Sequence, residues 1–339
     1  GRAGRQHLSL GYPVPLPDWA RAHGGPLFAA SFRTTPQDFR VTEILGWEFS
    51  GDGEHDYLWI EKTGANTEWV ARQLARHADV PNRDIGYAGL KDRHAVTLQW
   101  FSVPRWNAPD WGHFEVEGVK VLEVQRHHKK LRRGAHRANA FEIVIRGDGL
   151  DEHAAALEAR LEALREQGVP NYFGEQRFGR DGANLQLADD WAAGKRLPRH
   201  KRSIAISTIR SFLFNEALDR RVRDGTWNRL ASGDTANLDG TGSVFDVEHL
   251  DDEIVRRCEE MDIHPTGLLA GEGSPGVRED WSGALSAARV KPGVRSLRAR
   301  LNESLAETCN QTVRLSFALT RGSYATSVLR EIGDLTPKR

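Results

Sequence analysis

The residues best placed to do chemistry are a carboxylate and its two cationic neighbours, Lys91, Asp92 and Arg93. They follow the glycine-containing residues 86–90 and precede the apolar run 100–103, which is typical of a β-strand. A carboxylate can act as a general base or as a nucleophile at a sugar carbon, as in retaining glycosidases. An Asp at a turn also commonly caps the next element. From these residues alone, a catalytic role and a capping role for Asp92 both stay open.

A second carboxylate would be needed for glycosidase chemistry, and Glu43 is the candidate. It lies in residues 36–44, where the alternation of apolar and polar residues over 39–42 predicts a strand. Phe39 begins that alternation and fits a core position as well as a functional one. The sequence has no serine nucleophile elbow, P-loop or HExxH motif, which excludes several common enzyme classes.

The charge of the chain is balanced overall but segregated locally. Lys plus Arg equals Asp plus Glu, at 47 each, so this is not a uniformly basic nucleic-acid binder. Three segments nevertheless carry five or six Lys and Arg with no acids: 126–137, 195–202 and 289–300. Such segments can bind phosphates on a neutral protein, or they can be ordinary solvated surface.

The first basic segment leads directly into a predicted strand at residues 141–145. Asn139 and Phe141 alternate at its start, so both should point to the same side. We expect an amide and an aromatic ring at the lip of a site, with nearby cations holding phosphate. The candidate phosphate-binding cations of this loop are Lys129, Lys130, Arg132 and Arg133.

Residues 169–179 mix aromatic side chains with Gln176 and Arg177. Rings and guanidinium planes both stack on bases, so the segment fits a nucleic-acid contact. It fits equally well a packed turn at a domain junction, and the sequence does not decide between the two.

The elements that must position these residues read as a mixture of strands and helices. The pattern predicts strands near 57–62, 114–124, 141–145 and 312–319, and helices near 66–78, 150–167, 204–221, 250–261 and 328–332. Residues 1–26 are predicted to be loop. Because the β pattern returns at the end of the chain, the middle should be inserted into a domain that the C-terminus completes.

Cysteine content and hydropathy bear on metal binding, membrane insertion and cellular location. The two cysteines, Cys258 and Cys309, have no metal-ligand spacing, so no zinc site is expected. No apolar run approaches 18 residues, so no transmembrane helix is expected. With few cysteines and no signal peptide, we expect a cytoplasmic protein.

Six motifs in order resemble those of one enzyme family, the TruD-type tRNA pseudouridine synthases. AGLKDRHAVTLQWFSV resembles the family signature, and NYFGEQRFG resembles a second hallmark. The others are PQDFRVTE, LRRGAHRANAFEIVIRG, RSFLFN and GSYATSVLRE. Together they extend over nearly the whole chain, from residue 32 to residue 332.

The resemblance implies an α+β fold: a pseudouridine synthase catalytic domain with a mixed, largely antiparallel sheet flanked by helices. It implies that residues 1–164 and 301–339 form this discontinuous domain, and that 165–300 form an inserted α/β TRUD domain. The implied reaction is isomerisation of uridine to pseudouridine at position 13 of the tRNA D arm. Neither cofactor nor metal is implied, and we expect a monomer.

The resemblance also assigns roles to residues. Asp92 matches the catalytic aspartate, and the substrate-pocket positions are Phe39, Asn139, Phe141 and Tyr324. Tyr324 stands where the family often has Phe, which keeps a stacking ring and adds a hydroxyl. Supporting or phosphate-binding cations would be Arg33, Lys91, Arg93, Lys129, Lys130, Arg132, Arg133 and Arg177.

The implied mechanism takes the target base out of the RNA stack, and Asp92 then acts at ribose C1′. A covalent adduct and a glycal route are both open. Two other classes also remain: a non-catalytic RNA-binding chaperone, and a glycoside hydrolase with a pair of carboxylates.

Overall fold

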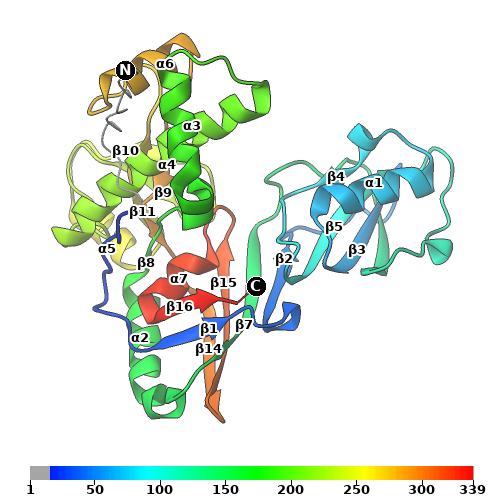
Figure 1. Ribbon diagram of the computed structural model, residues 1–339, viewed down its shortest axis with the longest axis horizontal. Coiled ribbons are helices and arrows are strands. Elements are labelled where there is room, and N and C mark those ends of the chain that lie inside the picture. The colour runs from blue at the N-terminus through cyan, green and yellow to red at the C-terminus, as the bar shows by residue number, and fades with distance from the viewer. Residues whose placement is uncertain (1–15, 339) are drawn as a thin grey trace, which may run out of the picture. The chain divides into compact units, whose positions relative to one another are not determined.

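The computed structural model describes residues 16–338, and the chain divides into two compact units (Figure 1). The first, here called the sheet unit, comprises His23–Gly168 and Ala299–Arg339. The second, the helical unit, comprises Val169–Arg298 together with the described residues before His23, which are 16–22. Of the loop predicted for residues 1–26, residues 1–15 lie outside the described part of the chain. Residues 16–26 contain neither helix nor strand.

The sheet unit is built on one ten-stranded sheet in the order β14-β15-β7-β2-β5-β3-β6. Strand β1 pairs with β7 and β16, and β4 pairs with β5. Two pairings, β2 with β5 and β1 with β16, are parallel, and the others are antiparallel. The sheet is therefore mixed and largely antiparallel, as predicted. The strands are β1 (Ala29–Phe32), β2 (Phe39–Ile44), β3 (His55–Thr63), β4 (Gly86–Tyr87), β5 (Val96–Pro104), β6 (Val119–His127), β7 (Ala138–Arg146), β14 (Asn302–Cys309), β15 (Thr312–Thr320) and β16 (Asp334–Pro337).

Side-chain alternation explains which residues the sheet turns inward. In β2 the buried positions are Phe39, Val41 and Glu43, so a carboxylate takes a place in the row of core residues. In β3 the row Leu58, Ile60 and Lys62 is fully buried, so a lysine likewise faces inward. Two charged groups thus lie in the interior of the unit.

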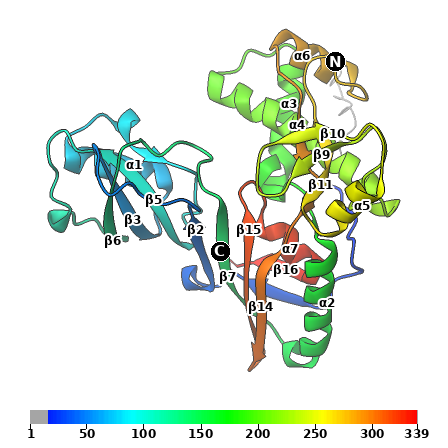
Figure 2. The ribbon, with the colours of Figure 1, turned by 180° about the vertical axis from the view of Figure 1, so that it is seen from behind.

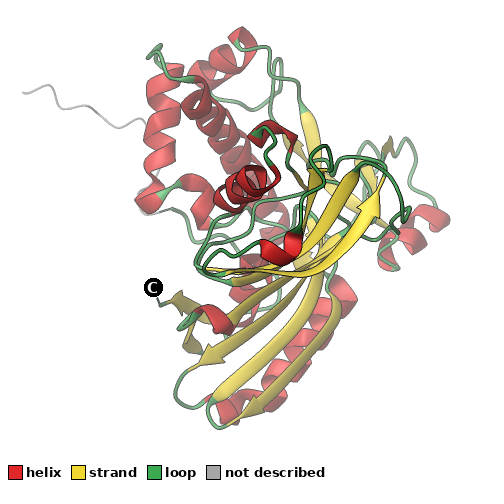
Figure 3. Cartoon of the chain, turned by 90° about the vertical axis from the view of Figure 1, so that its right-hand side faces the viewer, coloured by secondary structure: helices red, strands yellow, loops and turns green. Residues whose placement is uncertain are grey.

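Three α-helices and four short 3-10 helices complete the sheet unit. Helix α1 begins where predicted, because the side chain of Asn66 accepts a hydrogen bond of 2.8 Å from the Trp69 N–H. Its apolar face packs on β5, while α2 lies beside β14 (Figure 2). The twist of the strands is visible from the side (Figure 3). The helices are α1 (Thr67–Ala78), α2 (Ala154–Gln167) and α7 (Ala325–Ile332), with 3-10 turns at Pro36–Asp38, Asn82–Asp84, Trp111–His113 and Leu150–His153.

The helical unit packs its helices around aromatic side chains and carries a four-stranded sheet in the order β10-β9-β11-β12. Trp281, Phe212 and Phe178 are completely or almost completely buried in its core. The elements are β8 (Val169–Pro170), α3 (Ala183–Ala192), α4 (Arg199–Arg223), β9 (Thr235–Leu238), β10 (Val244–Asp246), α5 (Asp252–Glu259), β11 (Ile263–Leu269), α6 (Glu279–Ala287), β12 (Gly293–Ser296) and β13 (Arg298–Ala299), with 3-10 turns at Glu175–Phe178 and Arg180–Gly182. In the described part of the chain, no helix is long and apolar enough to cross a membrane.

The two units divide the chain at 22/23, 168/169 and 298/299, whereas the sequence prediction placed its domain boundaries at 164/165 and 300/301. We expected residues 1–164 to belong to the domain of Asp92, but the described residues before His23 group with the helical unit. The ring of Trp19 stacks on Tyr172 at 6.1 Å, and the Tyr172 hydroxyl donates to the Ala20 carbonyl at 2.9 Å. These long-range contacts are not readable from the loop-like composition of the segment.

Candidate active site

Asp92 lies in the connection between β4 and β5, and buried polar groups fix the backbone of that connection. The Lys91 N–H donates to Thr67 Oγ1 at 2.9 Å, and Gln99 Nε2 donates to the Gly89 carbonyl at 3.0 Å. Thr67 Oγ1 in turn donates to Gln99 Oε1 at 3.0 Å, and both side chains are buried. The start of α1 and the middle of β5 therefore hold the loop in one place.

Lys62 supports the same loop from inside the unit, and it was not among the residues predicted for the site. Its Nζ donates to the carbonyls of Ala65 at 2.9 Å, Lys91 at 3.3 Å and Asp92 at 3.5 Å. Burial lowers the pKa of Lys62 to about 8, although the nearby Asp92 carboxylate partly opposes the shift. Its position on the apolar row of β3 was the available signal, because a lysine there must be buried and bonded.

The carboxylate of Asp92 is held ionised. Its Oδ1 accepts a hydrogen bond of 2.8 Å from the His94 N–H, and Oδ2 accepts one from Arg33 Nη1 in an ion pair. Burial by itself would raise the pKa of Asp92, but the His94 N–H and the Arg33 guanidinium together hold it below its usual value. The side chain keeps 24% of its surface exposed, so a ligand can reach it.

Arg33 is in turn held by aromatic rings. Its guanidinium carbon lies 4.1 Å from the ring centroid of Phe39. Phe39 meets Phe141 edge to face at 6.2 Å, and Phe141 stacks on Phe317 at 5.3 Å. Phe39 and Phe141 are both buried, so their rings form a wall behind the Asp92–Arg33 pair.

Lys91 pairs with a different carboxylate. Its Nζ lies 3.6 Å from Glu43 Oε2, and both side chains are buried. Glu43 Oε1 accepts a hydrogen bond of 3.0 Å from the Trp100 N–H. Burial raises the pKa of Glu43, and the Lys91 ammonium opposes that rise. Among the cations predicted to support Asp92 or to bind phosphate, Arg33 is thus the one that the structure places on the Asp92 carboxylate.

Buried polar atoms without a hydrogen-bond partner gather near these two pairs. Within the described part of the chain, Asn139 Oδ1, Thr97 Oγ1 and His136 Nδ1 have no such partner. Asn139 stands opposite Glu43 in the β2–β7 ladder, and burial with nearby Lys91 and Arg321 lowers the pKa of His136 to about 4. Buried groups are almost always satisfied in folded proteins, so orphaned atoms mark a place where a ligand can bond.

Two further candidates, Arg93 and Tyr324, lie in connections that precede β5 and α7, respectively. Arg93 is exposed and, with Gly64 and Trp69, lines a hollow of about 240 Å³. Tyr324 precedes the first residue of α7. Its loop is tied to the basic segment, because Arg321 donates to the Gly134 carbonyl through its side chain and to Arg137 through its N–H.

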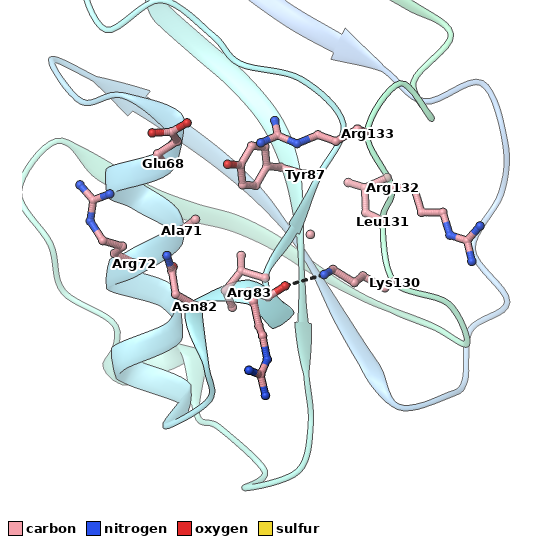
Figure 4. Close-up of a pocket in the computed structure, with 12 residues that line it drawn as sticks. Glu68, Ala71, Arg72, Asn82, Arg83, Tyr87, Lys130, Leu131, Arg132 and Arg133 are labelled. Carbon is pink, nitrogen blue, oxygen red and sulfur yellow. Dashed lines mark hydrogen bonds between the residues drawn. The ribbon is translucent and has the colours of Figure 1, made fainter. Parts of the chain in front are cut away.

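The basic loop after β6 lines a separate depression beside α1 (Figure 4). Lys130, Arg132 and Arg133 are among the residues lining it, whereas Lys129 is anchored through its carbonyl, which accepts from the Tyr57 hydroxyl at 2.6 Å. Asp92 does not line this depression. Lys130, Arg132 and Arg133 therefore belong to a second surface of the sheet unit.

Arg177 lies in the helical unit, and the segment around it is a packed turn. Asn215 holds the turn by accepting from the Phe173 N–H and donating to its carbonyl, both at 2.9 Å. Arg177 donates to Ser207 Oγ at 2.6 Å. The aromatic side chains of this segment, Tyr172, Phe173 and Phe178, are buried, so the packed-turn interpretation describes them.

Comparison with known proteins identifies the class of protein that this fold and site define. The family model described as tRNA pseudouridine synthase D (TruD) matches residues 23–188 and 183–286. The chain belongs to this family, and the resemblance and the enzyme class expected from the motifs are confirmed.

Individual relatives agree along nearly the full length. The chain is 44% identical to tRNA pseudouridine synthase D of Methylococcus capsulatus over 95% of this chain and 96% of that protein. It is 40% identical to the protein of the same name from Hydrogenovibrio crunogenus, over 95% and 98%. A crystal structure assigned to tRNA pseudouridine synthase D of Methanosarcina mazei matches with a TM-score of 0.66 at 22% identity, covering 93% of this chain and 94% of that one. This last likeness confirms the predicted fold class.

Proposed function

We propose that this protein converts a uridine of tRNA into pseudouridine, at position 13 of the D arm, with Asp92 as the catalytic carboxylate. The observation that carries the proposal is the state of Asp92: ionised, fixed at both oxygens, and still partly exposed. The relatives named above are called tRNA pseudouridine synthase D, which supports tRNA as the substrate.

The chemistry requires an ionised carboxylate near ribose C1′. The target base leaves the RNA stack at a cost of a few kcal/mol. Asp92 then breaks the N-glycosidic bond, either by attacking C1′ or by removing a sugar proton to give a glycal. The uracil turns in the pocket and rejoins through C5, so product and substrate contain the same atoms and no co-reactant is consumed.

The neighbouring residues divide the remaining tasks. Asn139 has a buried acceptor, Oδ1, without a partner in the described residues, and we propose that it binds the uracil N3–H. The Arg33 guanidinium fixes Asp92 and keeps it charged. Phe39 and Phe141 wall the pocket rather than offering an open face, because both rings are buried. Tyr324 is left as the stacking surface for the flipped base.

We assign the remaining cations to phosphate binding. These are Arg93, Lys129, Lys130, Arg132 and Arg133 on the sheet unit and Arg177 on the helical unit. Lys91 is assigned to the interior instead, because its ammonium pairs with buried Glu43. We also propose that residues 165–300 contain the inserted TRUD domain and that the protein acts as a monomer in the cytoplasm. A monomer is supported because Asp92, its cation and the pocket wall come from one chain.

The experiment compares wild type with Asp92→Asn on a tRNA transcript and on the same transcript with cytidine at position 13. Carbodiimide labelling followed by primer extension should show one new stop with wild type on the first transcript alone. An active Asp92→Asn enzyme would refute the role of Asp92, and a stop at another nucleotide would refute the position. Wild type that binds tRNA without converting it under single-turnover conditions would support the chaperone alternative. The hydrolase alternative is not favoured, because Glu43 is buried against Lys91.

A further inference from the structure

A groove of about 630 Å³ in the sheet unit has five cations among its twelve lining residues (Figure 4). It lies between α1 and the loop that follows β6, and its volume is in the range of binding sites for small molecules. Figure 4 shows Arg72 and Arg83 on the helix side and Arg133 over Tyr87 on the loop side. The lining also includes Lys130, Arg132 and one acid, Glu68.

These cations are not neutralised by the protein. Arg72, Arg83, Lys130, Arg132 and Arg133 are all exposed, and in the structure as described no carboxylate lies within ion-pair distance of any of them. Five unpaired cations against one acid attract a polyanion.

The groove is also preorganised, unlike a freely moving basic segment. Lys130 Nζ donates to the Arg83 carbonyl at 2.6 Å, so the loop is bound to the turn after α1. The Leu131 N–H donates to Ser102 Oγ at 2.9 Å. Gly86 leaves the room for this contact, because a Cβ there would lie 2.4 Å from the Leu131 carbonyl oxygen. Binding would therefore cost little ordering of the loop.

A flat surface stands at the loop side of the groove. The guanidinium carbon of Arg133 lies 3.7 Å from the ring centroid of Tyr87, which is half-buried. Aromatic rings and arginine planes are the surfaces on which unpaired bases stack. Tyr87 and Asp92 are five residues apart, so their Cα atoms are at most roughly 17 Å apart, about the length of five nucleotides along one strand of a duplex.

We propose that this groove binds the phosphate backbone of an RNA segment flanking the target uridine, with one base stacked at the Tyr87–Arg133 pair. The inference rests on the proposed function for the identity of the RNA. It adds a second point of attachment on the sheet unit, distinct from the pocket at Asp92. Phosphates would meet the unpaired cations, and the target nucleotide would lie at Asp92.

The test is a binding measurement in an Asp92→Asn background, so that it does not depend on turnover. The variant Arg83→Gln/Arg133→Gln removes two groove cations. Its matched control, Lys120→Gln/Arg314→Gln, removes two exposed cations of the same unit outside the groove lining. Affinity for unmodified tRNA is measured at several salt concentrations, and melting temperatures show that every variant is folded.

The groove variant should bind about 10- to 50-fold more weakly at 100 mM salt, and the slope of log K against log salt should be shallower by about 1.5. The control variant should change neither by a comparable amount. A third variant, Tyr87→Leu, should lose about 5-fold in affinity or more without changing the slope, because stacking does not release counterions.

Equal losses in the groove and control variants would overturn the proposal, as would an unchanged slope in the groove variant. The proposal would also be overturned if the groove variant lost affinity for a polyglutamate peptide as strongly as for tRNA and Tyr87→Leu did not weaken tRNA binding. That result would indicate a general anion site. Failure of the proposed function is a separate outcome: wild type would make no pseudouridine, while the binding differences among the variants would still be measured.

Discussion

Asp92 and Glu43 are two carboxylates of the sheet unit that each pair with one cation, yet their surroundings give them opposite properties. Asp92 keeps part of its surface exposed and accepts a backbone N–H and Arg33, and its pKa is lowered. Glu43 is completely buried against Lys91, and its pKa is raised. Glu43 also accepts a backbone N–H, so the difference indicates that access to solvent, rather than ion pairing or a backbone hydrogen bond, prepares a carboxylate for chemistry.

The largest expected effect follows from removing the charge of Asp92. Asp92→Asn should lower the rate of pseudouridine formation by at least about 10³-fold, because both open routes at C1′ need the ionised carboxylate. The melting temperature should fall by less than about 3 °C, because the single amide oxygen of Asn can still accept the hydrogen bond of His94 and the site is partly open to solvent, although Arg33 loses its acceptor. Single-turnover assays and thermal unfolding check both parts. A large loss of stability would mean that Asp92 is structural, as Glu43 is.

Glu43→Gln should show the reverse balance, with a cost mainly in stability. It leaves the Lys91 ammonium buried without a counter-charge, which costs about 3 kcal/mol and lowers the melting temperature by roughly 6–12 °C. The control is Glu43→Gln/Lys91→Met, in which both charges are removed and much of the loss should be regained. If Glu43→Gln melted like wild type but made no pseudouridine, Glu43 would take part in the chemistry.

The sequence could predict the positions of most elements because their local patterns agree with their environment. The alternation in β2, the Asn66 cap of α1 and the return of β pattern near Thr312 all appear as expected. The packing of Trp19 on Tyr172 could not be predicted, because it joins residues about 150 positions apart in a segment without periodicity. The same limit applies to Asn215, whose hydrogen bonds to Phe173 join the motifs RSFLFN and NYFGEQRFG.

For the candidate site, the sequence indicated Asp92 but not the arrangement of charges around it. The sequence named Arg33, Lys91 and Arg93 as possible supports without deciding among them, and the contact comes from Arg33. Lys91 bonds inward to Glu43 because the buried carboxylate of β2 needs a counter-charge. Pairing of this kind depends on which strands lie side by side, and that information is absent from local sequence.

Arg33→Gln would sharpen the comparison through the pH dependence of activity. In the pH–rate profile of the wild type, activity falls at low pH as Asp92 becomes protonated. Because the pKa of Asp92 is lowered, this acid limb should lie below the ordinary aspartate pKa of about 3.9. Without the guanidinium, fewer charges oppose the effect of burial, so the pKa of Asp92 should be higher and the acid limb should move to higher pH. Arg33→Lys keeps a positive charge and should show a smaller shift. Single-turnover rates measured from pH 4 to 7 test this, and an unmoved limb in Arg33→Gln would contradict the assigned role.

Lys62 provides the smallest expected effect and links the loop of Asp92 to the interior. Its pKa is about 8 in the folded protein, below the value of about 10.4 for an exposed lysine. Between these values the unfolded chain binds more protons than the folded one, so wild-type stability should rise with pH. Lys62→Met should lose that rise. The difference in unfolding free energy, wild type minus variant, should therefore increase by roughly 1 kcal/mol per unit between pH 8 and 10. A flat difference would show that Lys62 is not buried as a cation beneath Asp92, and the electrostatic contrast between Asp92 and Glu43 would then need another source.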